Sequence, residues 1–159
     1  MPGPLLRLKG GTDSATPSVN GVIARNLLRL SSLLEDETYR KLARETANTF
    51  AVEILQHPFL FVNLLDVVVG LEMGARNITG VVATDKEGVM ERVRAEAGLA
   101  ASTSTATVAL VDIRPSSEAA VPSAWLRSRN PLFRDLKPAS PPRNFLLVCE
   151  TGRCRIVDV

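Results

Sequence analysis

Apolar residues recur at helical spacing through the first half of the chain, and this pattern predicts three helices. The first is expected over residues 19–34, because Ser18 can cap its free amide groups. The second is expected over residues 36–57, where the proline that follows disfavours further helix. The third is expected over residues 59–73, with Gly74 as a left-handed cap at its end.

Each predicted helix has an apolar face that should contact a core. The core-facing residues expected in the first helix are Ile23, Leu27, Leu30 and Leu34, and Leu28 and Leu33 are expected to widen this apolar face. Those expected in the second are Tyr39, Ala43, Ala47, Phe50 and Ile54. The third helix is apolar on almost every side, yet it is shorter than the roughly 20 residues that span a bilayer. We therefore expect it to be buried among other helices rather than in a membrane.

The second half of the chain changes to short runs rich in valine and isoleucine, which predict strands. Residues 78–83 and 107–113 should form a parallel pair, because a predicted helix over residues 86–97 lies between them. Residues 145–149 and 154–159 should form a closing hairpin. The expected fold class is α+β, with antiparallel helices followed by a small α/β unit that ends in a β-hairpin.

This pattern divides the chain into three parts. Residues 1–16 are expected to be a flexible N-terminus, residues 17–75 a helical unit, and residues 76–159 a small α/β segment. Within that segment, residues 114–143 hold many of the prolines and predict a long irregular insertion. A short helix or turn in the middle of the insertion can be pinned by Trp125, Leu126, Leu132, Phe133 and Leu136.

Composition narrows the class of protein. The chain has 159 residues, 45% of them hydrophobic, and 19 basic against 17 acidic side chains. A net charge of +2 is too small to gather nucleic acid or an acidic membrane surface. The N-terminus lacks the apolar segment of a signal peptide, so an intracellular, cytoplasmic protein with no transmembrane helix is expected. No phosphate-binding glycine loop is present, and we expect no cofactor.

The two cysteines leave three interpretations open. Cys149 and Cys154 lie across the predicted hairpin, where facing residues come close enough for a disulfide. They are small apolar strand residues, a redox-sensitive pair, or half of a metal site. Two thiolates supply only half of the four ligands that structural zinc needs, so no metal is expected.

Polar residues at two other places allow a structural or a binding role. Thr84 and Asp85 follow a predicted parallel strand, where open sheets bind ligands, but Asp85 can also simply cap the next helix. Asn63 and Asp66 lie on the apolar third helix, where burial without partners is costly. They are expected to be hydrogen-bonded core residues or the wall of a pocket.

Three segments of the chain resemble the C-terminal part of the spermatogenesis-associated protein 20 family. The resemblance covers residues 13–113 and 144–159, and the intervening insertion does not align. Its most specific residues in the first segment are Ala15, Pro17, Ser18, Asn20 and the run Asn26, Leu27, Leu28, Arg29 and Leu30. Those at the end of the chain are Val148, Cys149, Glu150 and Cys154.

The family joins a thioredoxin-like domain to an (α/α)6 barrel of the six-hairpin glycosidase type and is linked to carbohydrate metabolism. The resemblance implies that this chain is a C-terminal fragment, whose helices form the last hairpins of such a barrel wall without independent catalysis. Missing barrel helices or a partner chain would then cover its exposed apolar helix faces. Nucleic acid and membrane are not expected partners.

Two alternatives remain open beside this structural role. One is a remnant of a sugar-binding or sugar-modifying enzyme, with a small sugar in a pocket around Asp13, Ser18, Asn20 and Asp66. The resemblance places Ser18 and Asn20 at the start of an inner helix, facing that pocket, and no catalytic residue can be nominated. The other is a thiol redox module that uses Cys149 and Cys154.

Overall fold

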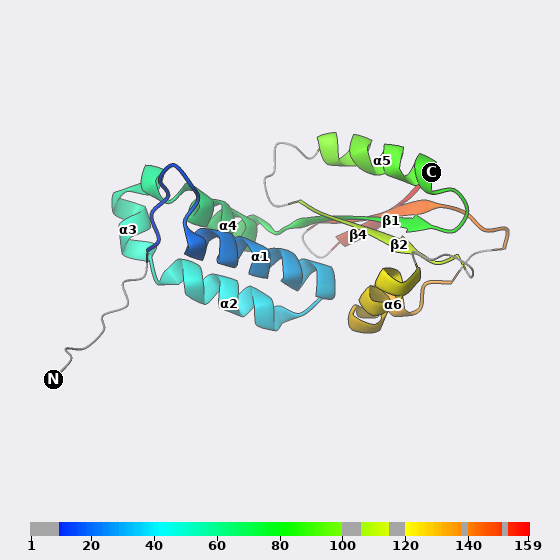
Figure 1. Ribbon diagram of the computed structural model, residues 1–159, viewed down its shortest axis with the longest axis horizontal. Coiled ribbons are helices and arrows are strands. Elements are labelled where there is room, and N and C mark those ends of the chain that lie inside the picture. The colour runs from blue at the N-terminus through cyan, green and yellow to red at the C-terminus, as the bar shows by residue number, and fades with distance from the viewer. Residues whose placement is uncertain (1–9, 100–105, 115–119, 138–139, 151–152) are drawn as a thin grey trace.

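A helical region and a sheet region lie next to each other along the long axis of the molecule (Figure 1). This computed structural model describes residues 10–99, 106–114, 120–137, 140–150 and 153–159. Within these residues there are seven α-helices and a four-stranded mixed sheet. The fold is α+β and ends in a β-hairpin, as the sequence predicts.

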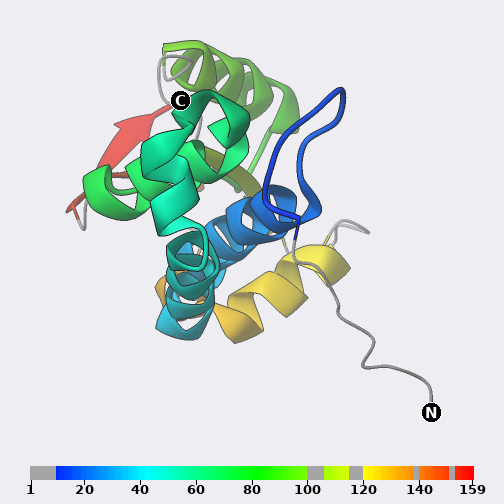
Figure 2. The ribbon, with the colours of Figure 1, turned by 90° about the vertical axis from the view of Figure 1, so that its left-hand side faces the viewer.

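The helical region contains four α-helices and one 3₁₀ turn. They are α1 (Val19–Leu34), α2 (Glu37–Asn48), α3 (Ala51–Gln56), η1 (Pro58–Leu60) and α4 (Val62–Met73). Two predicted caps are confirmed: the Ser18 hydroxyl accepts from the Gly21 N–H at 3.1 Å, and the Asp36 carboxylate accepts from the Thr38 N–H at 2.9 Å. Helix α3 lies at the end of the molecule away from the sheet (Figures 1 and 2).

The buried face of α1 agrees with the predicted one at Leu27, Leu28, Leu33 and Leu34 and differs from it at Ile23. The face centres on Ala24, Leu28 and Ser31, whereas Ile23 is 46% exposed. Small residues explain why this side of α1 is buried, because they let α4 approach closely. A Cβ atom added at Gly21 would lie 2.8 Å from the Cβ of Asn63 on α4. Close approach of the two backbones therefore decides which side of α1 is covered.

The predicted second and third helices are each interrupted. Residues 36–57 form α2 and α3, which are separated at Thr49 and Phe50. The hydroxyls of Thr46 and Thr49 donate to carbonyls four residues earlier, a contact that tends to bend helices. The third helix begins as η1 and continues as α4, and Gly74 (φ 86°, ψ 156°) has a positive φ but not the expected left-handed helical conformation.

The sheet has the strand order β2-β1-β3-β4. The strands are β1 (Arg76–Val82), β2 (Thr107–Asp112), β3 (Phe145–Glu150) and β4 (Arg153–Asp158). Strands β1 and β2 are parallel and are connected through α5 (Lys86–Leu99), whereas β3 pairs antiparallel with both β1 and β4. The predicted parallel pair and the predicted hairpin are both confirmed.

Each face of the sheet has its own core. On the α5 side, the buried residues are Ile78, Val82, Val89, Val93, Leu146 and Val148. On the opposite side they are Val81, Val111, Ile113, Leu126 and Phe133, with Leu33 and Leu34 from the end of α1 packed against them. Figure 1 shows α5 and α6 on opposite sides of the sheet. The central strand β1 is therefore covered on both faces, whereas the outer strand β4 is mostly exposed.

The described central part of residues 114–143 is helical, which confirms the short helix predicted in the middle of the insertion and shows that it is followed by a second one. That part forms α6 (Ala120–Arg129) and α7 (Pro131–Arg134), which cover the second face of the sheet. Leu126 and Phe133 are buried there, whereas Trp125 and Leu132 are exposed. A few apolar residues were enough to anchor two short helices because the sheet supplies the remaining apolar surface.

A buried ion cluster ties the outer strand to α5. Glu96 is 5% exposed, and one of its carboxylate oxygens lies 3.1 Å from Arg76 and 3.2 Å from Arg155. Arg76 also contacts Glu150 at 2.7 Å. These pairs link α5, β1, β3 and β4.

Within the described residues, no helix is both long enough and apolar enough to cross a bilayer.

Candidate functional site

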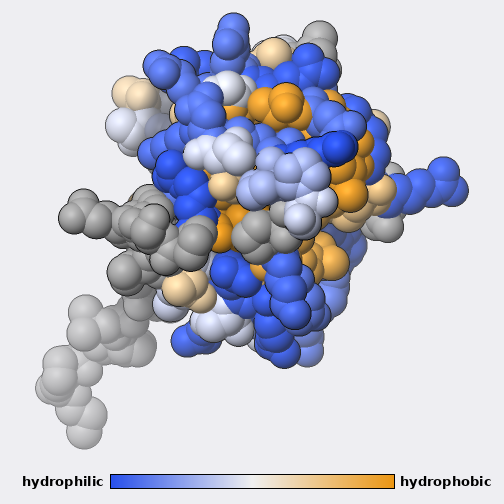
Figure 3. Space-filling model, turned by 90° about the vertical axis from the view of Figure 1, so that its right-hand side faces the viewer, coloured by the Kyte–Doolittle hydropathy of each residue, from blue (hydrophilic) through white to orange (hydrophobic). Residues whose placement is uncertain are grey.

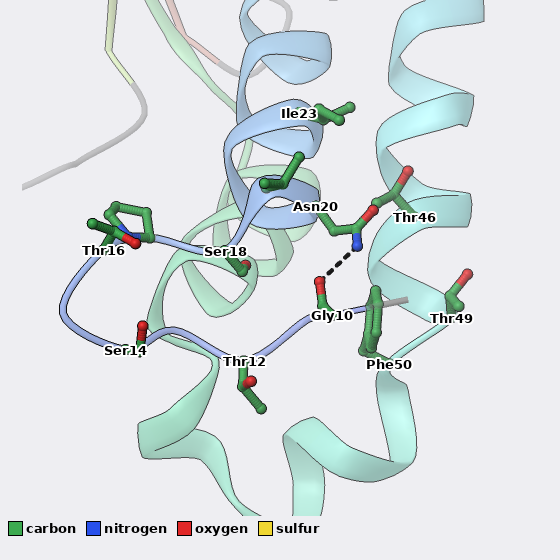
Figure 4. A pocket seen from close by; sticks show the side chains of 12 residues that line it. Gly10, Thr12, Ser14, Thr16, Ser18, Asn20, Ile23, Thr46, Thr49 and Phe50 are labelled. Carbon is green, nitrogen blue, oxygen red and sulfur yellow. Dashed lines mark hydrogen bonds between the residues drawn. The ribbon is translucent and has the colours of Figure 1, made fainter. Parts of the chain in front are cut away.

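A cleft of about 720 Å³ opens where the chain enters α1 (Figure 4). One wall is the loop of residues 10–17, and the other is formed by the start of α1 and the end of α2. Seven of its side chains carry a hydroxyl or amide group: Thr12, Ser14, Thr16, Ser18, Asn20, Thr46 and Thr49. Phe50 and Ile23 add apolar surface. Among the described residues that line the cleft, none has a charged side chain.

Asn20 holds the two walls together. Its side-chain amide nitrogen donates to the Gly10 carbonyl at 2.7 Å, and Figure 4 shows the side chain reaching from α1 toward α2. The Asn20 carboxamide oxygen is an additional acceptor on the cleft side. Ser18 lines the same cleft, but its hydroxyl already accepts from the first turn of α1. Both residues that the resemblance places at a pocket therefore line this cleft. Ser18 acts chiefly as the cap of α1.

Asp13 fixes the loop rather than facing the cleft. Its two carboxylate oxygens accept from the Ser18 N–H at 2.8 Å and from the Asn63 N–H at 2.9 Å. The second bond caps α4, for which Phe61 supplies no side-chain cap. Burial alone raises the pKa of Asp13, but the hydrogen bonds from Asn63 and Ser18 outweigh it and hold the pKa below its usual value. Residues 10–16 thus make defined contacts, whereas residues 1–9 of the predicted flexible terminus lie outside the described residues.

Asp66 also lies away from the cleft. Its carboxylate is 3.2 Å from the Arg25 guanidinium, so this ion pair joins α4 to α1. Of the four residues grouped by the enzyme hypothesis, only Ser18 and Asn20 line the cleft. Glycoside hydrolysis usually needs two positioned carboxylates. The described cleft can therefore hydrogen-bond an uncharged polar ligand but contains no carboxylate pair for acid–base chemistry.

Only two of the polar residues that line the cleft, Ser18 and Asn20, were expected there, and the residues contributed by α2 and the break after it were not. Thr46, Thr49 and Phe50 come from the end of α2 and the break that follows it. Phe50 is covered by the loop, since a Cβ atom added at Gly11 would lie 2.5 Å from its ring. The two threonines are three residues apart and so lie on one side of the predicted helix. This spacing is the only feature of the sequence that could have indicated them. Their meeting with the loop depends on contacts far apart in sequence.

The two cysteines face each other in the closing hairpin. Cys149 and Cys154 are register partners in β3 and β4, their Cα atoms are 4.0 Å apart, and they form a disulfide. Of the three interpretations, the structure therefore shows a linked pair. Within the described residues, no group of three histidine, cysteine or acidic side chains is arranged to hold a metal ion. A redox role for the pair stays a prediction.

The side chains of Asp85 and Asn144 hydrogen-bond the turn at the carboxyl end of β1. Asp85 caps α5 by accepting from the Glu87 and Gly88 N–H groups, and these bonds lower its pKa. The Asn144 side chain accepts from two backbone N–H groups of the same turn at 2.9 Å and donates to the Asp85 carbonyl at 2.6 Å. Asp85 is thus a helix cap, and Asn144 fills the position where a ligand of an open sheet would bind.

Comparisons with protein-family models, with curated proteins and with solved structures find no match for this chain. Function is therefore inferred from the geometry of the chain and from the sequence resemblance described above.

Proposed function

We propose that this chain is a structural module: the C-terminal portion of a spermatogenesis-associated protein 20-like protein, with no catalysis of its own. Its helices would supply the last hairpins of an (α/α)6 barrel wall and would pack against the other helices of that barrel. The sequence resemblance over residues 13–113 and 144–159 supports this assignment. The structural observation that supports this proposal most is that α4 buries one apolar side and exposes another.

Helix α4 is apolar on two opposite sides but is covered on only one. Leu64, Val67 and Leu71 are buried against α1 and α2. On the other side lie Val62, Val69 and Met73, which are 58%, 49% and 70% exposed and share one face at helical spacing. A helix that is apolar all round is normally buried on all sides. The uncovered side is therefore suited to packing against further helices.

The elements that precede α4 in the chain also carry exposed apolar side chains. Leu55 on α3 is 84% exposed, and Phe59 on η1 is 72% exposed. Both follow the break after α2, so they extend the apolar side chains toward the end of the molecule away from the sheet. Exposed apolar clusters of this kind mark interfaces. The surface formed by Leu55, Phe59, Val62, Val69 and Met73 is called the outer apolar face below.

Site-specific photo-crosslinking in cells, with mass spectrometry of the products, tests the proposal. A photoreactive residue at position 69, on the outer apolar face, should crosslink to helices upstream in the same polypeptide. The same residue at position 91, on the exposed side of α5, is the matched control and should not. An endogenous product near 17.2 kDa with no crosslink at position 69 would contradict the barrel-wall role.

A second candidate function is binding of an uncharged polyhydroxyl ligand, such as a small sugar, in the cleft beside Asn20. The observation that favours it is the lining of hydroxyl and amide groups without charge. Sugars present the same mixture of donors and acceptors, and binding sites combine such groups with apolar surface. Ile23 and Phe50 provide the apolar part here.

Titration of the ¹⁵N-labelled chain with glucose and mannose tests this second function. The amides of residues 10–20 should shift, and Asn20→Ala should weaken binding by up to about tenfold, because one neutral hydrogen-bonding group is lost. Thr38→Ala, at the far end of α2, is the control and should bind as the wild type does. Shifts that persist unchanged in Asn20→Ala would argue against a site in this cleft.

A further inference from the structure

A second cleft lies at the junction of the helical and sheet regions. It has a volume of about 540 Å³ and is lined by the ends of α1 and α4, the start of α2, and parts of β1, β3 and β4. A much smaller inner chamber of about 10 Å³ adjoins it. The two spaces share Ser32, Glu35, Asn77, Leu132 and Cys149 as lining residues, so the chamber forms the inner end of the cleft.

The inner chamber contains two buried polar atoms without hydrogen-bond partners. They are Asn77 Oδ1 and Thr107 Oγ1. Asn77 and Thr107 are register partners on neighbouring strands, so their side chains lie on the same face of the sheet. Thr107 is only 9% exposed. Buried polar atoms of this kind are expected to bind water, an ion or a ligand.

The geometry of the chamber selects a small donor group. The Asn77 amide nitrogen donates to the Ser32 carbonyl at 3.4 Å, which leaves the amide oxygen as an acceptor. The Thr107 hydroxyl can also accept. A volume near 10 Å³ is about that of one water-sized group. An ammonium group has a similar size and carries three N–H donors.

The mouth of the cleft favours a cation. Four carboxylates and one guanidinium line the cleft. Glu72 is paired with Arg44, and Arg40 donates to the Leu71 carbonyl at the end of α4. Glu150 is similarly paired with Arg76.

Two of the carboxylates have no positive partner within the described residues. Glu35 and Glu37, at the turn between α1 and α2, show no ion pair in that part of the chain. Although Glu35 is largely exposed, its partial removal from solvent and the nearby charge of Glu37 raise its pKa. A cation bound in the cleft would stabilise both carboxylates.

We propose that this cleft binds a primary aliphatic amine. Its ammonium group enters the inner chamber and donates to Asn77 Oδ1 and Thr107 Oγ1, and its alkyl chain lies along Leu132. Glu35 supplies the nearest negative charge at the mouth of the chamber. This site is separate from the cleft beside Asn20 and does not depend on the barrel-wall role.

Isothermal titration of the full chain with n-butylamine hydrochloride tests the proposal. Butylammonium should bind, whereas n-butanol, which lacks the charge, and tetramethylammonium, which lacks N–H donors, should not. Thr107→Val and Glu35→Gln should each weaken binding by about tenfold or more, because each removes a partner of a charged group. Glu91→Gln, on the exposed side of α5, is the matched control and should leave binding unchanged.

Several outcomes would overturn the proposal. These are equal heats with tetramethylammonium, unchanged affinity in Glu35→Gln, or a crystal of the amine-soaked chain with only a water in the chamber. If Thr107→Val does not fold, Glu35→Gln still tests the site because its side chain is exposed at a turn. In the wild type, the side-chain amide resonances of Asn77 should also shift on addition of butylammonium and not of butanol. Resonances that do not move would likewise reject the site.

Discussion

The sheet region and the helical region differ in how completely their apolar surfaces are covered. The sheet is covered by α5 on one face and by α6 and α7 on the other. Figure 3 views this end of the molecule, and hydrophilic residues cover much of the visible face. In the helical region, the outer apolar face is left uncovered. The sheet region thus buries both faces of its central strand and leaves exposed apolar side chains such as Trp125 and Ile156 at its periphery, whereas the helical region leaves one side of the apolar helix α4 exposed.

The two regions nevertheless share one element. The end of α1 contributes Leu33 and Leu34 to a core of the sheet, while Ala24 and Leu28 belong to the helical core. Asn130 strengthens this junction: its side-chain amide nitrogen donates to the Leu33 carbonyl at 2.8 Å. The predicted boundary near residue 75 therefore divides the sequence into two parts, but residues from both parts pack together in one core.

Replacing a buried leucine should reduce the stability of the chain far more than replacing an exposed one. Leu28→Ala removes a side chain that is 1% exposed and should lower the free energy of unfolding by about 2–5 kcal/mol. Leu55→Ala, at an 84% exposed position, should change it by less than about 0.5 kcal/mol. Urea unfolding followed by circular dichroism measures both. Equal losses would mean that the outer apolar face is already covered in solution.

A middle-sized effect tests how tightly the two regions are joined. Asn130 is 1% exposed and also accepts from the Leu132 N–H at 2.8 Å, which caps α7. Asn130→Ala should lower the free energy of unfolding by about 1–3 kcal/mol, because the Leu33 carbonyl loses its buried donor. Hydrogen exchange should then quicken at the end of α1 and in α6. The exposed Asn26→Ala is the control, and similar exchange in both variants would show that the regions are not coupled here.

The smallest expected effect is a pH dependence in the helical region. The pKa of Asp13 is lowered in the folded state, so its carboxylate stabilises the fold above the unfolded pKa of about 3.9. This contribution is lost as the pH falls through the lowered folded value. The wild type should therefore lose stability on acidification below about pH 5 more steeply than Asp13→Asn.

Thermal unfolding at a series of pH values measures the difference between these two proteins. At pH 7 the variant should be less stable by at most about 1 kcal/mol, because asparagine can still cap a helix. Asp36 and Asp85, whose pKa values are also lowered, are present in both proteins and cancel in the comparison. Parallel pH profiles would contradict the role of Asp13 as an ionised cap.

Local patterns predicted the elements well, and contacts between distant residues account for the errors. Runs rich in valine and isoleucine located the strands, and helical spacing located most helices, because those signals lie within a few residues. The burial of the Gly21 side of α1 was not predicted, because Gly21 permits a backbone approach that hydrophobicity does not reveal. The role of α6 was missed because its few apolar residues rely on the sheet.

The candidate sites show the same limit. Ser18 and Asn20 were expected at a pocket because of the family resemblance, whereas Thr46 and Phe50 meet them only through folding. The pairing of Asp13 with Asn63 spans 50 residues, and the juxtaposition of Asn77 with Thr107 depends on strand register. The disulfide was one of the alternatives that the hairpin spacing allowed.

The strand order has a consequence for how the chain matures during synthesis. Strand β1 is central, yet its antiparallel neighbour β3 begins only at Phe145. The helices described here end at Met73, so they can form while one edge of β1 still waits for β3 to leave the ribosome. A premature stop before β3 would leave that edge free to pair with another nascent chain and would remove Leu146 and Val148 from the core beneath α5.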